Sequence, residues 1–167
     1  NHNTLMSQLI FKFPFKTKYF EQDFYVSSNN FSAYKLIESW PNWSGKLLNI
    51  YGATGCGKTH LSKILEKKIN KIKIVEASKI NDDTIDEMEN ISCLIIDNYE
   101  SNISEKLFYS IINQSKLFNN YILINSVSAL NKMPFKLKDL KSRINSFIFI
   151  GIELPTDDLL KVIISKT

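Results

Sequence analysis

The chain contains few cysteines, a single arginine and no long hydrophobic run. Its two cysteines, Cys56 and Cys93, cannot build a disulfide framework, and neither lies where half of a structural disulfide is expected. A reducing, cytoplasmic location is therefore expected. No apolar stretch approaches the ~18 residues that cross a membrane, and no signal peptide is expected, so a membrane partner is excluded. The scarcity of arginine argues against a small P-loop kinase, in which several arginines grip phosphates from a lid.

The charge of the chain is mildly positive, and its hydrophobic content of 44% is enough for one domain with a proper core. The net charge is +4. Seven lysines could form a basic face toward nucleic acid, or they could be solvated surface residues, and direct DNA binding is not expected. These lysines are Lys12, Lys16, Lys18, Lys67, Lys68, Lys71 and Lys73.

Residues 52–59 read G-x-x-x-x-G-K-T, the pattern of a phosphate-binding loop. The apolar run 46–51 before it suits a buried strand, and apolar residues recur at helical spacing after it, up to about residue 69. Glycines allow successive backbone N–H groups to point at phosphate oxygens, and the helix N-terminus adds a positive potential. Lys58 would reach the β- and γ-phosphates, and the Thr59 hydroxyl would ligate Mg²⁺. The loop residues predicted to bind the nucleotide are Gly52, Thr54, Gly55, Cys56, Gly57, Lys58 and Thr59.

Cys56 within this loop has two interpretations. A thiol close to a helix N-terminus can have a lowered pKa and be reactive. A small side chain can also simply fill the space inside a tight loop.

Apolar runs alternate with helical patterns along the chain, which predicts a parallel sheet with helices on both faces. The fold class is therefore α/β, a P-loop NTPase of three α/β/α layers with a five-stranded parallel sheet. Strands are predicted at 46–51, 72–76, 93–97, 121–125 and 147–150. Helices are predicted at 30–39, from the phosphate loop to 69, at 82–89, from Asn102 with Glu105 as a capping-box partner, at 137–144 and after Pro155.

Polar residues end two of the predicted strands, at the sheet edge where such proteins bind ligands. Asp97 has the position of a Walker B acid that orients Mg²⁺ and its waters. The next residue, Asn98, cannot accept a proton from an attacking water, and Glu100 would lie past the strand end, so hydrolysis by the isolated chain is doubtful. Asn125 could be a polar sensor between Asp97 and the γ-phosphate, or it could cap a turn.

Arg143 is the one arginine among 21 basic residues, which suggests a task that lysine performs poorly. The guanidinium group makes forked contacts with phosphate oxygens. Leu140 and Ile144 would pack inward on a helix, and Arg143 would project outward. It could then be a catalytic arginine finger that reaches a nucleotide on a neighbouring protein. The alternatives are a surface helix arginine and one end of an ordinary salt bridge.

Four segments together resemble the DnaA family of AAA+ proteins. They are the run Gly-Ala-Thr-Gly-Cys-Gly-Lys-Thr-His-Leu at 52–61, the segment Phe-Tyr-Val-Ser-Ser-Asn-Asn at 24–30, the strand Leu-Ile-Ile-Asp at 94–97 and the run Leu-Lys-Ser-Arg at 140–143. The stretch between residue 76 and Asp97 is only about 20 residues, and no helix-turn-helix follows. Within the family the chain is therefore more similar to the Hda group of DnaA-related regulators.

The resemblance implies further site residues and a domain division. Phe24, Val26 and His60 would contact the nucleotide, which is ADP or ATP with Mg²⁺. Residues 1–20 would be an N-terminal arm, 21–152 the AAA+ base domain and 153–167 the start of a lid that is lacking or truncated here. In the arm, Gln8, Leu9, Phe11 and Phe13 occupy the place of a motif that binds the DNA polymerase sliding clamp. A hydrophobic arm that packs on its own domain is the alternative.

The function implied by the resemblance is regulation of chromosomal replication initiation. The protein would dock on the sliding clamp and promote inactivation of ATP-bound DnaA, and it could also form a homo-oligomer. An autonomous AAA+ ATPase, such as a DnaA-type initiator or a helicase loader, is one alternative. An adaptor with a purely structural nucleotide is another.

Overall fold

A computed structural model of the protein describes residues 30–100 and 102–153. The strands are β1 (Leu47–Gly52), β2 (Ile72–Glu76), β3 (Cys93–Tyr99), β4 (Tyr121–Ser126) and β5 (Ile148–Ile152). The helices are α3 (Phe31–Glu38), α4 (Lys58–Lys68), α5 (Asp82–Glu87), α6 (Glu105–Phe118) and α7 (Lys138–Ile144), with short 3₁₀ turns η1 (Ala77–Lys79), η2 (Met88–Asn90) and η3 (Leu130–Lys132). Phe24, Val26, the N-terminal arm and the predicted last helix lie outside the described residues.

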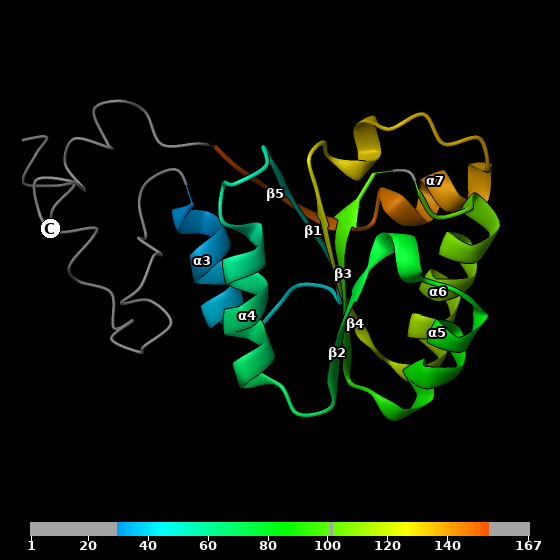
Figure 1. Ribbon diagram of the computed structural model, residues 1–167, viewed down its shortest axis with the longest axis horizontal. Coiled ribbons are helices and arrows are strands. Elements are labelled where there is room, and N and C mark those ends of the chain that lie inside the picture. Colours follow the sequence, from blue (N-terminus) through cyan, green and yellow to red (C-terminus); the bar gives the residue numbers. More distant parts are fainter. Residues whose placement is uncertain (1–29, 101, 154–167) are drawn as a thin grey trace, which may run out of the picture.

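The five strands form one parallel sheet in the order β2-β3-β4-β1-β5, which confirms the predicted fold class (Figure 1). Central strands of a parallel sheet are buried on both faces and are therefore almost continuously apolar. This explains the run of apolar residues in β3, where residues 93–96 are fully buried. Because all strands run the same way, their carboxyl ends meet at one edge of the sheet.

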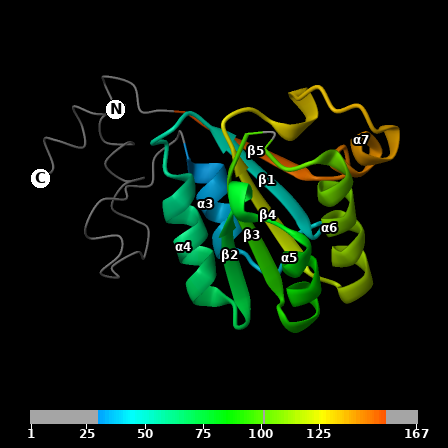
Figure 2. The same ribbon diagram turned by 45° about the vertical axis from the view of Figure 1, so that its right-hand side comes forward.

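Helices cover both faces of the sheet, as Figures 1 and 2 show from two directions: α3 and α4 lie on one face, and α5, α6 and α7 lie on the other. Each face has its own apolar cluster. Leu61 and Leu65 of α4 pack with Leu48 and Ile50 of β1 in the first cluster. The second cluster gathers side chains of α6 and α7 against the other sheet face, among them Phe108, Ile111, Leu140 and Ile144. The predicted inward packing of Leu140 and Ile144 is thus confirmed.

The predicted start of α6 at Asn102 is wrong, because α6 begins at Glu105 with Ser104 as its N-cap. The Ser104 hydroxyl accepts a hydrogen bond from the Leu107 amide at 3.1 Å, as a serine N-cap should. Asn102 lies outside the helix, and its side-chain oxygen accepts a hydrogen bond from the Glu100 amide at 3.1 Å. Glu105 is therefore not the partner in a capping box with Asn102.

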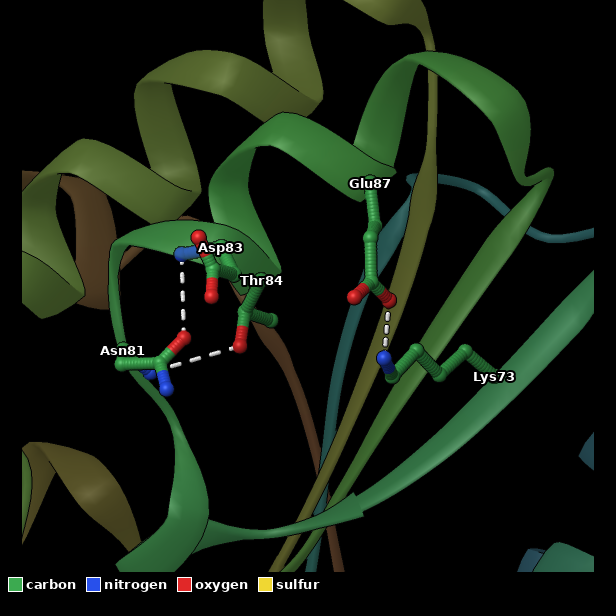
Figure 3. Close-up of polar contacts among 5 residues, drawn as sticks. All are labelled: Lys73, Asn81, Asp83, Thr84 and Glu87. Carbon is green, nitrogen blue, oxygen red and sulfur yellow. Dashed lines mark hydrogen bonds and ion pairs between the residues drawn. The ribbon is translucent and has the colours of Figure 1, made fainter.

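The connection from β2 to β3 is short and well capped (Figure 3). Asn81 begins α5 with a capping box: its side-chain oxygen accepts from the Asp83 amide at 2.9 Å, and its own amide donates to the Thr84 hydroxyl at 3.3 Å. The Lys73 ammonium of β2 forms an ion pair with Glu87 at the end of α5. This connection contains only η1, α5 and η2. Among the described helices, none is long and apolar enough to cross a membrane.

Candidate nucleotide-binding site

The loop between β1 and α4 has the backbone geometry that its glycines make possible. Gly55 has φ of 86° and Gly57 has φ of 108°, both in the left-handed region that side chains disfavour. Gly57 is also the N-cap of α4, so the loop leads directly into the helix N-terminus. At Gly52, a Cβ atom would lie 2.4 Å from the Ile152 carbonyl oxygen and 2.8 Å from the Cys56 sulfur. The conformation of the loop therefore depends on glycine at these positions.

Lys58, the first residue of α4, lies with its ammonium over the loop. The Lys58 Nζ donates to the Gly52 carbonyl oxygen and also approaches the Ala53 carbonyl oxygen at 3.4 Å. The positive end of the α4 backbone and the lysine charge thus act on the same small volume. The arrangement favours a negatively charged ligand at the loop.

Asp97 of β3 is the centre of a polar cluster beside the loop. One of its carboxylate oxygens, Oδ1, accepts from the Asn98 amide at 3.0 Å and from the Asn125 side-chain amide at 3.3 Å. The other, Oδ2, lies 3.5 Å from the Thr59 hydroxyl of α4. Three segments far apart in the sequence therefore converge on one buried carboxylate, as predicted from the carboxyl ends of the strands.

Asn125 of β4 is fully buried, and it connects Asp97 to α4. Its Nδ2 donates to the Ser62 hydroxyl of α4 at 2.7 Å as well as to Asp97. Within the described chain, its Oδ1 is buried and has no hydrogen-bond partner. These contacts lie inside the sheet edge rather than in a turn, and the role of Asn125 as a sensor stays a prediction.

A cavity of about 280 Å³ opens over this cluster. Seven of the predicted site residues line it, namely Thr54, Gly55, Gly57, Lys58, Thr59, His60 and Asn125. The remaining lining residues are Asn98, Tyr99, Glu100, Ser126 and Val127. Gly52 and Cys56 do not line it. Cys56 is buried beneath the loop, with its sulfur close to Gly52.

Glu76, at the end of β2, contacts the site and was not predicted from the sequence. The Asn98 Nδ2 donates to both Glu76 carboxylate oxygens, at 3.0 and 2.8 Å. Glu76 is the register partner of Asp97 in the β2–β3 pair. The only signal in the sequence was its place as the last residue of a predicted strand.

Arg143 is not brought to this cavity. It lies on α7, and its guanidinium carbon is 6.0 Å from the centre of the Tyr109 ring of α6. Its Nη1 is buried without a hydrogen-bond partner, and no ion pair of Arg143 is found in the described ranges. The geometry does not match the alternative of an ordinary ion pair, and the finger role stays a prediction.

The donor set around Asp97 fits a magnesium ion that is held jointly by protein and nucleotide. Mg²⁺ prefers oxygen ligands and usually combines one or two protein ligands with phosphate oxygens and waters. The Asp97 carboxylate and the Thr59 hydroxyl offer two such oxygens side by side. Across residues 30–100 and 102–153, no three His, Cys, Asp or Glu side chains gather into a metal-binding group of their own.

The chain matches one protein family model and is similar to two curated DnaA proteins. The family model described as RNA helicase matches residues 48–140, more than half of the chain. The chain is similar to the chromosomal replication initiator protein DnaA of Buchnera aphidicola subsp. Baizongia pistaciae (strain Bp), with 30% identity over 94% of this chain and 39% of that DnaA. It is similar to DnaA of Spiroplasma citri, with 30% identity over 66% of this chain and 29% of that protein. The chain thus spans well under half the length of these curated relatives.

The fold is also similar to that of a solved DnaA. The structure of AMPPCP-bound DnaA from Aquifex aeolicus matches with a TM-score of 0.67 and 23% identity, over 86% of this chain and 52% of that one. At this identity the likeness concerns the fold. It agrees with the sheet order and the helical layers described above.

Proposed function

Because the chain belongs to the family described as RNA helicase and carries a DnaA-like AAA+ domain, we propose that it binds ADP or ATP with Mg²⁺. One observation carries this proposal: Lys58, Thr59 and Asn125 line a single cavity at the N-terminal end of α4, and Thr59 and Asn125 both contact the buried Asp97 carboxylate beside it. Positive charge, backbone N–H groups and hard oxygen ligands are what a nucleotide polyphosphate with magnesium requires.

Each part of the loop has a proposed task. The backbone of the phosphate loop binds the phosphates, with Gly52 and Cys56 shaping it from beneath and Lys58 supplying charge. Thr59 and Asp97 hold Mg²⁺ directly or through its waters. His60 lies at the cavity wall, and Phe24 and Val26 would contact the adenine side.

Hydrolysis by the isolated chain is proposed to be slow. Asn98 stands where a second acid would polarise water, and an amide oxygen accepts a proton far less readily than a carboxylate does. The chain then acts mainly as a nucleotide-dependent partner rather than as an autonomous ATPase.

The partner in this proposal is DnaA, whose inactivation the chain promotes together with the sliding clamp. Two observations support a regulator over an initiator. The β2–β3 connection holds only η1, α5 and η2, which leaves little room for helices that handle DNA. Arg143 lies on α7 rather than in the chain's own cavity, which suits action on a neighbouring molecule. Gln8, Leu9, Phe11 and Phe13 are the proposed contacts with the clamp.

A DnaA-type initiator is the second candidate. It is favoured by the fact that both curated relatives above are initiators. An initiator should turn over ATP or assemble on origin DNA without a separate DnaA.

A reconstituted assay separates the two candidates. ATP-loaded DnaA, DNA-loaded clamp and the ADP-loaded chain are mixed, and conversion of DnaA to its ADP form is followed. We expect the wild-type chain to accelerate this conversion. Arg143→Ala should reduce the acceleration by about tenfold or more. Gln8→Ala should reduce the acceleration only when the clamp is present. No acceleration, combined with steady ATP turnover by the chain alone, would support the initiator instead.

A further inference from the structure

The ends of β2 and β3 place a second carboxylate behind the cavity wall. Glu76 and Asp97 are paired across the two strands, so their side chains emerge at the same edge of the sheet. The residue after Asp97 is Asn98, which lines the cavity, whereas Glu76 lies behind it and does not. Asn98 stands where related ATPases often carry a second acid. Glu76 supplies a carboxylate close to this position, but from the neighbouring strand β2.

Asn98 is held in one orientation by contacts at both of its ends. Its backbone has φ of 54°, a left-handed conformation at a strand end, next to a register irregularity in the β3–β4 pair. Its backbone amide donates to Asp97 at 3.0 Å, and its Nδ2 donates to both oxygens of Glu76. Backbone strain of this kind persists where the surroundings overdetermine it, and it concentrates at functional sites.

The Glu76 contact also decides which end of the Asn98 amide is available. A carboxylate accepts hydrogen bonds and cannot donate one, so the amide nitrogen must face Glu76. The amide oxygen is then directed away from Glu76. The negative charge behind the amide increases the acceptor strength of this oxygen, because hydrogen bonds in sequence polarise one another.

We propose that Glu76 is a positioning residue of the nucleotide site and acts through Asn98. It turns the Asn98 amide so that its oxygen accepts a hydrogen bond from the water that attacks the terminal phosphate of ATP. This inference rests on the proposed nucleotide function. In the attack, the water oxygen forms a bond to the γ-phosphorus while the bond from that phosphorus to the bridging oxygen breaks, and ADP leaves with the electron pair. The proton passes to solvent or phosphate, since the amide oxygen orients the water without taking its proton.

A transition-state mimic tests this role without relying on turnover. Calorimetry would compare MgADP alone with MgADP plus aluminium fluoride, which imitates the phosphoryl group together with the attacking water. We expect the wild-type protein to bind the fluoride complex about tenfold or more tightly than ADP alone, and Glu76→Ala to lose this gain. Glu76→Gln keeps an acceptor oxygen for the Asn98 amide, but it removes the charge and can also donate to the amide oxygen, so it should keep only part of this gain. Binding of ADP alone should change less than about twofold in both variants.

A double variant tests separately whether Glu76 acts through Asn98. If Glu76 acts through Asn98, Glu76→Ala should have no further effect in an Asn98→Ala background. Asp86→Asn, which removes an exposed carboxylate on α5, is the matched control and should behave as the wild type.

Several results would overturn the inference while leaving nucleotide binding intact. They are an equal fluoride gain in Glu76→Ala and wild type, no fluoride gain in a wild type that binds ADP, or additive losses in the double variant. A wild-type protein that binds no ADP would instead refute the proposed function itself.

Discussion

At the scale of single residues, buried amide side chains shape the wall of the cavity. Asn49 is fully buried in β1, and its Nδ2 donates to the Ile124 carbonyl oxygen at 2.9 Å and to the Ser126 hydroxyl at 3.0 Å. Its Oδ1 accepts from the Leu130 amide at 2.9 Å. An unpaired buried polar group costs about 1–3 kcal/mol, so these bonds fix the segment after β4 against β1. Ser126, which lines the cavity, is therefore held from the sheet interior.

A second buried residue, Cys93, makes the stability of the fold sensitive to alkaline pH. Burial raises the pKa of this thiol to about 12, whereas an unfolded chain would release the proton near pH 8.5. Above that pH the unfolded state loses a proton that the native state keeps. The contribution of Cys93 to the free energy of unfolding is therefore unchanged below about pH 8.5 and decreases as the pH rises above it. We expect a loss on the order of 1–2 kcal/mol by pH 10. Urea unfolding at pH 8, 9 and 10 would measure it.

Cys93→Val is the matched variant for this prediction, because it keeps the shape of the side chain and removes the titrating group. Its unfolding midpoint should depend less on pH than that of the wild type. The same slope in both proteins would show that Cys93 does not contribute.

At the scale of elements, α7 takes its position from α6. No side chain caps the N-terminus of α7 from within its own segment. The Glu105 carboxylate at the start of α6 instead accepts hydrogen bonds from the Lys136 amide at 3.0 Å and from the Leu137 amide at 2.8 Å. The helix that carries Arg143 is thus connected to the helix that carries Tyr109.

Removal of this connection should loosen α7 selectively. We expect Glu105→Ala to speed hydrogen exchange in residues 136–144 by about threefold to tenfold, with smaller changes in α4. The backbone donors of Leu137 and Lys136 lower the pKa of Glu105, so the wild-type contact is present above the usual titration range of a glutamate and is lost as the pH falls below it. Exchange measured by mass spectrometry at pH 7, with Glu89→Gln as control, would reveal the effect. Equal exchange in α7 of both variants would contradict it.

The sequence predicted elements better than it predicted the contacts between them. Strand β2 matched its predicted range, and Asp97 and Asn125 came together as expected, because alternating elements and strand ends can be recognised from local patterns. The start of α6 was missed because Ser104 and Asn102 are both good caps, and the Asn102 side chain accepts from the Glu100 amide instead of capping the helix. Asn49 and Glu76 were missed for another reason: their partners depend on strand order, which local patterns do not contain.

At the scale of the whole molecule, the order of the strands explains where the cavity forms. β4 lies between β1 and β3, so the loop after β1 and the acid of β3 flank Asn125 from both sides. Arg143 belongs to α7, on the face opposite α4 (Figure 2). One molecule therefore carries both the proposed phosphate site and a separate arginine outside its own cavity. This arrangement suits a protein that binds a nucleotide in its own cavity and uses its arginine on a neighbouring molecule.

Binding of an adenine nucleotide at the loop 52–59 is best measured by calorimetric titration of the wild-type protein and of Lys58→Ala with MgADP. Loss of a charged hydrogen-bond donor at phosphate costs about 1.5–3 kcal/mol, so the variant should bind about tenfold to a hundredfold more weakly. Circular dichroism of both proteins would check that the fold is intact. One binding event per chain in the wild type and a much weaker one in the variant are the predicted results. Identical titration curves for the two folded proteins would show that Lys58 and its loop do not bind the nucleotide.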